Sequence, residues 1–305
     1  MDRLFAMKVF VQVVDTGSFS KTALALNLPA PSVSRLVQSH EAHLAVRLLN
    51  RTTRSVRLTD DGRAYYERCV RVLDDIDEME AGAGRSHRSA SGRVRVSLPA
   101  SVAKGVLIPA LPAFVAAYPD VTIDLVVSDR PVDLAGESLD CAIRVGNVIS
   151  DEVVSKQAGE AWNIVCASPA YLAAHGEPAT LEALQQHIGV HYVSQVTGRV
   201  QPWDFSIDGR PHTLRMKSVV TVNDADAYVA CGVASLGIVC GSFYSLHPQL
   251  AAGGLRRLLA QYQVSPRPVQ VIHRPDRHLP RKTRVFIDWF CGVYAELSAR
   301  MAGPA

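Results

Sequence analysis

Residues 17–54 read GSFSKTALALNLPAPSVSRLVQSHEAHLAVRLLNRTTR and predict two short helices joined by a tight turn, followed by a basic segment. Ser18 is a suitable cap for the first helix, because its hydroxyl can accept a hydrogen bond from an unpaired backbone N–H. Asn27 suits the turn, since asparagine tolerates left-handed backbone. Pro31 fits the first turn of the second helix. The apolar residues expected to face inward are Phe19, Ala23, Leu24, Leu26, Val33, Leu36 and Val37.

The outward side of the second helix carries polar side chains suited to nucleic acid. Ser32, Ser34, Arg35 and Gln38 place hydroxyl, guanidinium and amide groups at the end of the helix that would enter a DNA major groove. Base edges and phosphates are recognised by groups of this kind. The pattern therefore predicts that this helix reads DNA.

Residues 47–58 predict a basic β-hairpin. Arg51 and Arg54 flank Thr52 and Thr53, and all four side chains can reach phosphate. Arginine suits this task because its planar fork pairs with phosphate oxygens while its charge persists. A solvated basic loop is the alternative interpretation of the same residues.

Short signatures follow one another in a fixed order here: Ser-Phe-Ser, Ala-x-x-Leu, Val-Ser-Arg, Arg-Leu-Leu-x-Arg and Leu-Thr-x-x-Gly. This order resembles the winged helix-turn-helix of the LysR-type transcriptional regulators. The resemblance implies a sequence-specific regulator that binds successive major grooves of a promoter palindrome. The expected DNA-binding residues are Ser18, Pro31, Ser32, Ser34, Arg35, Gln38, Arg51, Thr52, Thr53 and Arg54.

The distribution of charge supports a nucleic-acid partner. The 305 residues carry a formal net charge of only +3. Residues 1–58 hold eight basic and three acidic side chains, a difference of +5, whereas the remainder holds 24 basic and 26 acidic side chains, a difference of −2. A basic head on a near-neutral body is typical of a phosphate-binding module.

The N-terminus has no pattern of a signal peptide, and no apolar run was expected to approach the roughly 18 residues of a membrane span. We therefore expect a cytoplasmic protein without a membrane partner. Six scattered cysteines form no C-x-x-C pair, so neither a metal nor a cofactor is expected, and buried reduced thiols are the simplest reading. A redox switch between Cys231 and Cys240 remains an alternative.

Thr59 is expected to cap a helix that runs to about Gly82. Its apolar residues Tyr65, Cys69 and Val72 begin a heptad seam that continues with Ile76 and Met79. The resemblance implies pairing with a second subunit, and packing on its own domain is the alternative. The Gly/Ser-rich residues 81–92 predict a hinge.

Strands alternating with helices from residue 93 onward predict a mixed or parallel α/β sheet. The expected organisation is an α+β multidomain protein with a winged helix-turn-helix at 1–58, a linker or dimerisation helix and hinge at 59–92, and an effector-binding domain at 93–305. The resemblance implies two α/β lobes like those of type 2 periplasmic binding proteins. Lobe I would comprise about 93–161 and 267–305, and lobe II about 162–266. Predicted strands include 190–194, 200–207, 213–222 and 236–240, and a last amphipathic helix at 282–301 would cover lobe I.

The resemblance implies a small-molecule effector between the lobes. Ser101 follows a strand and begins a helix, where a hydroxyl and free N–H groups can bind an anion or merely cap the helix. Arg144 ends an apolar strand, at the edge where open sheets bind ligands, or else forms a structural ion pair. An organic acid is therefore expected. The candidate contacts are Pro99, Ala100, Ser101, Val102, Arg144, Val145, Gly146, Tyr192, Ser194 and Asn223.

Other functions fit the sequence less well. An enzyme would need a catalytic constellation, yet no H-E-x-x-H, G-x-S-x-G, P-loop or dinucleotide-binding motif is present. A solute-binding transport protein would need a signal peptide and would lack the basic head. A ligand-independent DNA-binding protein and a thiol-based redox regulator stay open as alternatives.

We expect the effector to shift the arrangement of a homodimer or homotetramer, and so the DNA bend, with RNA polymerase as a further partner. The sequence departs from the family pattern at Pro29 and Ala30, where a capping hydroxyl and a polar residue are usual. It departs again at His40, where leucine is usual, and at Ala45, which replaces a turn glycine. These changes bear on operator preference and on local packing.

Overall fold

The computed structural model describes residues 2–52, 55–83, 90–148, 150, 152–207, 209–275 and 279–302. The chain divides into two compact units, residues 1–89 and 90–305. Each unit has its own hydrophobic core, and each is described by itself below.

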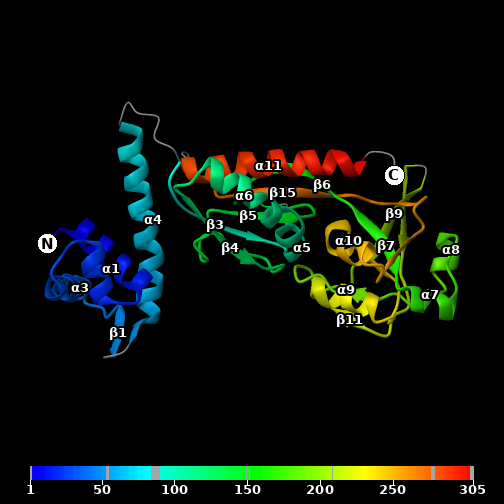
Figure 1. The fold of residues 1–305 in the computed structure, drawn as a ribbon, viewed down its shortest axis with the longest axis horizontal. Helices are drawn as coiled ribbons and strands as arrows, with labels where there is room; N and C mark the ends of the chain where they lie inside the picture. Colours follow the sequence, from blue (N-terminus) through cyan, green and yellow to red (C-terminus); the bar gives the residue numbers. More distant parts are fainter. Residues whose placement is uncertain are drawn as a thin grey trace. The chain divides into compact units, whose positions relative to one another are not determined.

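The first unit is a winged helix-turn-helix (Figure 1), as expected from the sequence. Ser18 caps the second helix by accepting a hydrogen bond from the Lys21 N–H at 3.3 Å, and Asn27 takes the left-handed φ of +54° in the turn. Val9, Phe10 and Val37 pack at the centre of its core. Its elements are α1 (Arg3–Thr16), α2 (Phe19–Ala25), α3 (Ala30–Leu44), β1 (Leu49–Thr52), β2 (Ser55–Leu58) and α4 (Asp60–Ala83).

Two apolar side chains of this unit do not face the core. Leu24 is 83% exposed, because the seven-residue α2 turns Thr22 and Ala23 inward and leaves Leu24 on the opposite side. Leu4 also lies outward, since α1 buries Ala6, Val9, Phe10 and Val13 instead. The inward stripe of α1 therefore begins at Ala6.

The start of α4 packs on its own domain. Thr59 caps the helix, as expected, through a 2.9 Å hydrogen bond from the Gly62 N–H to its Oγ1. Tyr65 lies against Phe10 with ring centroids 5.8 Å apart, and Cys69 is buried in the same core. Val72 is exposed. The predicted seam is thus divided: its first two residues serve the intramolecular core, whereas its third, Val72, does not.

His40 is buried, with 1% of its surface exposed, so the edge position that the sequence allowed does not apply. Its Nε2 is hydrogen-bonded to the Tyr65 hydroxyl at 2.9 Å and ties α3 to α4. Its Nδ1 has no hydrogen-bond partner among the residues that the structure describes. Ala45 ends α3 with a left-handed φ of +54°, a conformation that glycine would adopt more easily.

Lobe I of the second unit is built on a five-stranded mixed sheet with the order β4-β3-β5-β15-β6. β3 pairs in parallel with β4 and β5, whereas β15 pairs antiparallel with β5 and β6. Figure 1 shows α11 lying along this sheet, and Phe286, Phe290 and Tyr294 of α11 pack into its core, as predicted. The elements are β3 (Gly92–Leu98), β4 (Val121–Val127), β5 (Cys141–Val145), β6 (Val154–Ala161), β15 (Arg267–His273) and α11 (Arg281–Ala302).

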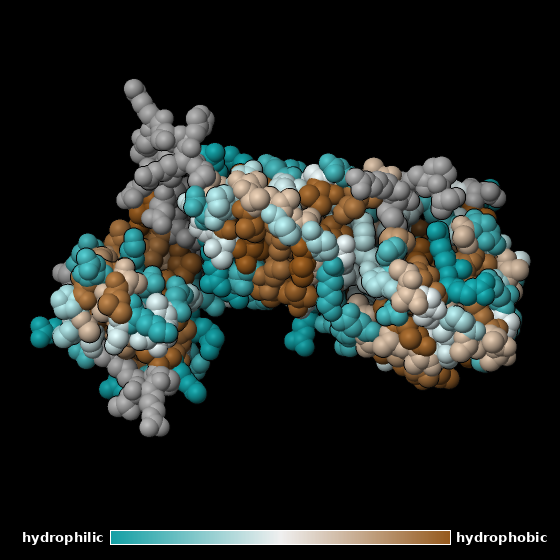
Figure 2. Space-filling view, viewed as in Figure 1, coloured by the Kyte–Doolittle hydropathy of each residue, from teal (hydrophilic) through white to brown (hydrophobic). Residues whose placement is uncertain are grey.

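A continuous helical run follows β3: α5 (Ala100–Val102), the π-helical turn η1 (Ala103–Leu107) and α6 (Ile108–Ala117). By length and composition alone this run could cross a membrane, contrary to the expectation from the sequence. Val106, Leu107 and Phe114 pack in the lobe I core, which favours the role of a core helix. Figure 2 shows apolar surface over this run, where Ile108 and Val115 are about half exposed.

Lobe II contains three small sheets, with the orders β12-β7-β13, β10-β9-β14 and β11-β8. The predicted strand at 213–222 is wrong, because β10 ends at Leu214 and β11 begins only at Thr221. The strand predicted at 236–240 is shorter in the structure, where it begins at Val239. The elements are β7 (Asn163–Ala167), α7 (Pro169–His175), α8 (Leu181–Leu184), β8 (His191–Tyr192), β9 (Trp203–Ile207), β10 (Arg210–Leu214), β11 (Thr221–Val222), α9 (Ala225–Val233), β12 (Val239–Ser242), α10 (Phe243–Ala251), β13 (Arg256–Leu258) and β14 (Gln263–Val264).

Candidate functional site

The polar face of α3 is open to solvent in the first unit. Pro31, Arg35 and Gln38 are exposed, while Ser32 and Ser34 are half-buried. The helix begins after Pro29, which provides no side-chain cap, so its first N–H groups depend on other partners. Val33 and Val37 hold the opposite face in the core. The structure therefore brings the predicted contacts of this helix onto one accessible surface.

The predicted wing forms the antiparallel hairpin β1–β2, with Leu49 paired to Leu58 and Thr52 to Ser55. The backbones of Arg51 and Thr52 lie in β1, and their side chains are outside the described part. Thr53 and Arg54 also lie outside the described residues. Ser18, the remaining predicted contact, is half-buried, and its hydroxyl is engaged as the cap of α2.

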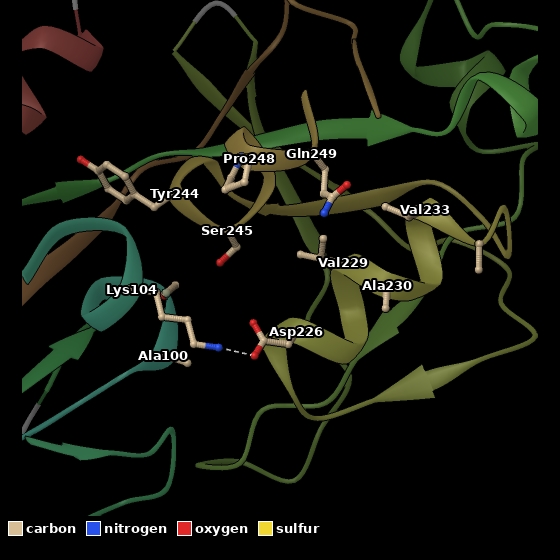
Figure 3. A pocket seen from close by; sticks show the side chains of 12 residues that line it. Ala100, Lys104, Asp226, Val229, Ala230, Val233, Tyr244, Ser245, Pro248 and Gln249 are labelled. Carbon is tan, nitrogen blue, oxygen red and sulfur yellow. Dashed lines mark hydrogen bonds and ion pairs between the residues drawn. The ribbon is translucent and has the colours of Figure 1, made fainter. Parts of the chain in front are cut away.

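Two adjoining cavities lie between lobe I and lobe II of the second unit. The first, of about 510 Å³, is lined mainly by apolar side chains of α9 and α10 together with Ala100, Ser101 and Lys104 (Figure 3). The second, of about 420 Å³, is polar and shares Ala100, Lys104 and Asp226 with the first. Its other lining residues are Val127, Ser128, Asp129, Arg130, Gln195, Asn223 and Asp224.

Lys104 of η1 forms an ion pair with Asp226 of α9 across the lobes, as the dashed line in Figure 3 marks. Both side chains are more than half exposed, so the pair contributes little stability and can exchange with solvent. It lines both cavities and therefore lies at their common boundary.

The residues predicted at the start of the lobe I helix take different positions. Ser101 lines the first cavity and Ala100 lines both. Pro99 is buried immediately before α5. The side chain of Val102 packs into the lobe I core, so only its backbone is available to a ligand.

Arg144 is held within lobe I by three hydrogen bonds. Its Nη1 donates to the Ile143 carbonyl at 2.7 Å, and its Nη2 donates to Ser97 Oγ at 2.9 Å and to the Arg130 carbonyl at 3.4 Å. Burial lowers the pKa of Arg144, opposed by the charge of Asp129. Burial likewise raises the pKa of the Asp129 carboxyl, opposed by Arg144. Among the described residues, Arg144 forms no ion pair within 4 Å.

Val145 and Gly146 lie against a residue that the sequence reasoning missed, Arg267. Its Nη2 donates to the Val145 carbonyl at 3.5 Å, and its Nη1 donates to Gln201 Oε1 at 3.5 Å. The Ser-Pro-Arg-Pro sequence at 265–268, an arginine between prolines at the start of a strand, was the available signal. Burial is the main cause of the lowered pKa of Arg267. Burial is also the main cause that raises the pKa of Tyr192 to about 12.

The remaining predicted contacts, Ser194 and Asn223, form hydrogen bonds within lobe II. The Ser194 hydroxyl accepts hydrogen bonds from the N–H groups of Val196 and Thr197, at 3.2 and 3.3 Å, and so stabilises a turn. Asn223 lines the polar cavity, and its carbonyl accepts a 2.7 Å hydrogen bond from Gln195. Neither side chain is among the hydrogen-bond partners of Arg267.

The cysteines lack the features of reactive thiols. Burial raises the pKa of the thiols of Cys69, Cys141, Cys166, Cys240 and Cys291, and a raised pKa keeps a thiol protonated and unreactive. Cys231 and Cys240 are both free thiols in this structure. No observation of the described chain therefore favours the redox alternative.

Comparisons with known proteins agree in both units. The family model "Bacterial regulatory helix-turn-helix protein, lysR family" matches residues 4–63, and "LysR substrate binding domain" matches residues 87–293. The chain is 34% identical to the HTH-type transcriptional regulator YhjC of Escherichia coli (strain K12), over 97% of this chain and 99% of YhjC. It is 36% identical to an HTH-type transcriptional repressor of Pseudomonas aeruginosa (strain UCBPP-PA14), over 97% and 93% of the two chains.

Two solved full-length structures have a similar fold. The Vibrio cholerae virulence activator AphB matches with a TM-score of 0.56 and 28% identity, over 95% of this chain and 98% of that one. CrgA, a LysR-type transcriptional regulator from Neisseria meningitidis, matches with a TM-score of 0.58 and 30% identity, over the same shares.

Proposed function

This chain belongs to the LysR family of transcriptional regulators, and we propose that an organic acid bound between lobe I and lobe II controls how it binds or bends promoter DNA. Regulators of this family bind DNA and small-molecule effectors, form oligomers and are not enzymes, as expected from the sequence. The observation that carries the proposal is the pairing of an exposed polar α3 in the first unit with two interlobe cavities in the second.

On the DNA side, the proposed base and backbone contacts on α3 are Ser32, Ser34, Arg35 and Gln38, with Ser18 and Pro31 at the neighbouring helix starts. Arg51, Thr52, Thr53 and Arg54 of the wing would supply phosphate contacts. The basic charge of residues 1–58 supports this assignment, because phosphate neutralisation supplies most sequence-independent affinity for DNA. Residues 1–58 thus form the proposed DNA-binding domain, and 59–92 the proposed linker and hinge.

On the effector side, residues 93–305 form the proposed effector-binding domain. The cavities lined by Ala100, Ser101 and Asn223 support a ligand between the lobes. A ligand can change the regulator only by preferring one arrangement of its parts to another. We place the protein in the cytoplasm, as a homodimer or homotetramer paired through α4, with RNA polymerase as a further partner.

The test is titration of the purified chain onto the DNA upstream of its own gene, at several salt concentrations and with nonspecific competitor. We expect saturable, competitor-resistant binding that weakens with salt. If Arg35 binds the DNA backbone, Arg35→Ala should weaken binding and lower the slope of log K against log salt by about one phosphate contact. If Arg35 binds a base, Arg35→Ala should instead weaken binding and relax the sequence preference. Arg210→Ala, which removes an exposed charge from lobe II, is the matched control. If the binding is weak and competitor DNA removes it, this result would count against an operator in the DNA upstream of the gene.

A further inference from the structure

Arg267 begins β15, where the chain returns from lobe II to lobe I. Its guanidinium is half-buried and makes only the two 3.5 Å contacts with Gln201 Oε1 and the Val145 carbonyl, which lie at the limit of hydrogen-bond length. No carboxylate of the described residues comes within 4 Å of it. A partly buried cation with five donors and such weak partners is costly unless an anion joins it.

Arg144 differs in this respect. It makes three hydrogen bonds inside lobe I, two of them at 2.7 and 2.9 Å, and so braces β5 against Ser97 and the carbonyl of Arg130. Of the two half-buried arginines at the end of this sheet, Arg267 is therefore the one whose donors are more weakly engaged.

The surroundings of Arg267 leave room for its guanidinium. Gly146 has a φ of +106°, and a Cβ atom built there would lie 2.6 Å from Arg267 Nη2. Any other residue at this position would be strained and would also displace the guanidinium. The nearby carboxylate of Asp204 already accepts a 2.6 Å hydrogen bond from the Thr213 hydroxyl. Local geometry thus keeps Arg267 in place without neutralising it.

Tyr192 supplies a second donor on the lobe II side. Tyr192 of β8 pairs with Val222, the residue before Asn223 in the wall of the polar cavity. Its carbonyl accepts a 2.8 Å hydrogen bond from the N–H of Gln201, whose side chain contacts Arg267. With its pKa raised to about 12 by burial, the phenol keeps its proton at neutral pH and can donate a hydrogen bond. The Asp129 carboxylate lines that cavity, and the described residues offer it no hydrogen bond.

We propose that Arg267 and Tyr192 bind the carboxylate of the effector, and that Asp129 accepts a hydrogen bond from a hydroxyl or amino group of the same molecule. The proposal rests on the proposed function and narrows its ligand to a hydroxy- or amino-carboxylate. A dicarboxylate is disfavoured, because its second charge would face a cavity that holds three aspartates, Asp129, Asp224 and Asp226, against the two cations Lys104 and Arg130.

The experiment is thermal unfolding of the full chain followed by tryptophan fluorescence, because Trp162, Trp203 and Trp289 all lie in the second unit. The probes are lactate, serine and 3-hydroxybenzoate, the matched amides lactamide and 3-hydroxybenzamide, and the dicarboxylate succinate, all at constant ionic strength. We expect stabilisation by at least one hydroxy- or amino-carboxylate, and none by the amides or by succinate. Equal stabilisation by acid and amide, or by none of the acids, would overturn the proposal.

Arg267→Met should weaken binding of the stabilising acid by about ten- to a hundredfold, the usual effect of losing a charged hydrogen bond. Arg267→Lys should retain part of it, and Arg210→Met should match the wild type. Without ligand, Arg267→Met should melt at a higher temperature, because it removes a half-buried charge that only two 3.5 Å contacts stabilise. A lower melting temperature, or acid binding that survives the change to methionine, would make Arg267 structural.

The DNA titration separates this proposal from the proposed function. Arg267→Met should bind upstream DNA as the wild type does and lose only the response to the acid. Wild-type protein that fails to bind DNA would contradict the proposed function, whatever the melting curves show. A DNA-binding protein whose acid response persists in Arg267→Met would contradict this inference alone.

Discussion

Protonation of His40 should destabilise the first unit at mildly acidic pH. Burial is the main cause that lowers the pKa of His40, and the charge of His43 adds to it, while Glu41 acts in the opposite direction. Because the folded-state pKa lies below the unfolded value of about 6.5, stability is complete above that pH. As the pH falls below about 6.5, the unfolded chain takes up the proton first and stability is lost until the folded-state pKa is reached.

The size of the effect follows from the linkage. Between pH 6.5 and 5.5 the cost is at most about 1 kcal/mol, the limit in which the unfolded state alone takes up the proton. For a unit of 89 residues this corresponds to a fall in melting temperature of about 4–8 °C. His40→Leu combined with Tyr65→Phe removes both the imidazole and the hydroxyl that it pairs with, so the polar atoms of this pair leave together. The buried Cys69 thiol, a weak hydrogen-bonding group, loses its interaction with Tyr65. This double variant should lack that part of the pH dependence.

Calorimetry of the full chain measures the effect. Tryptophan fluorescence identifies the transition of the second unit, so the remaining transition belongs to the first. Ser39→Ala, at an exposed and uncharged position of α3, is the control and should keep the wild-type pH dependence. If the double variant and the wild type lose the same stability between pH 6.5 and 5.5, His40 does not resist protonation and the reasoning fails.

Three further changes test other parts of the chain. Gly62→Ala should destabilise the first unit by about 1–3 kcal/mol in denaturant unfolding, because its Cβ would lie 1.9 Å from the Leu48 carbonyl oxygen; unchanged stability would mean that α4 can shift freely. Arg144→Ala should destabilise the second unit by about 1–3 kcal/mol in denaturant unfolding, because it removes the hydrogen bonds to Ser97 and to the Arg130 carbonyl; unchanged stability would mean that Arg144 does not brace β5. Arg54→Ala should weaken binding to every DNA sequence and flatten the salt dependence by about one phosphate contact, and an unchanged slope would remove Arg54 from the phosphate contacts.

Local signals predicted the first unit well. The Ser18 cap, the left-handed Asn27 and the Thr59 cap depend on residues within a few positions of one another, and all three appear in the structure. The position of Leu24 was wrong because α2 is too short for periodicity to define its inward face. Burial of His40 also escaped prediction, since it depends on Tyr65, 25 residues away.

In the second unit, the regular apolar strands were predicted and the exposed ones were not. β6 has no apolar signature in its first half, because most side chains there are exposed at the sheet edge. β13 and β14 are three and two residues long, too short for a periodic pattern. The π-helical turn η1 lies inside a run that was predicted simply as a helix.

The sequence by itself determined the family, the winged helix-turn-helix and an α/β sheet in the second unit, and it suggested a ligand between two lobes. These depend on capping residues, on hydrophobic period and on short motifs, all of which are local. Only the tertiary structure decided which arginine has weakly engaged donors. Arg144 and Arg267 are 123 positions apart, and their difference lies in contacts with Ser97, Val145 and Gln201 that folding alone brings together.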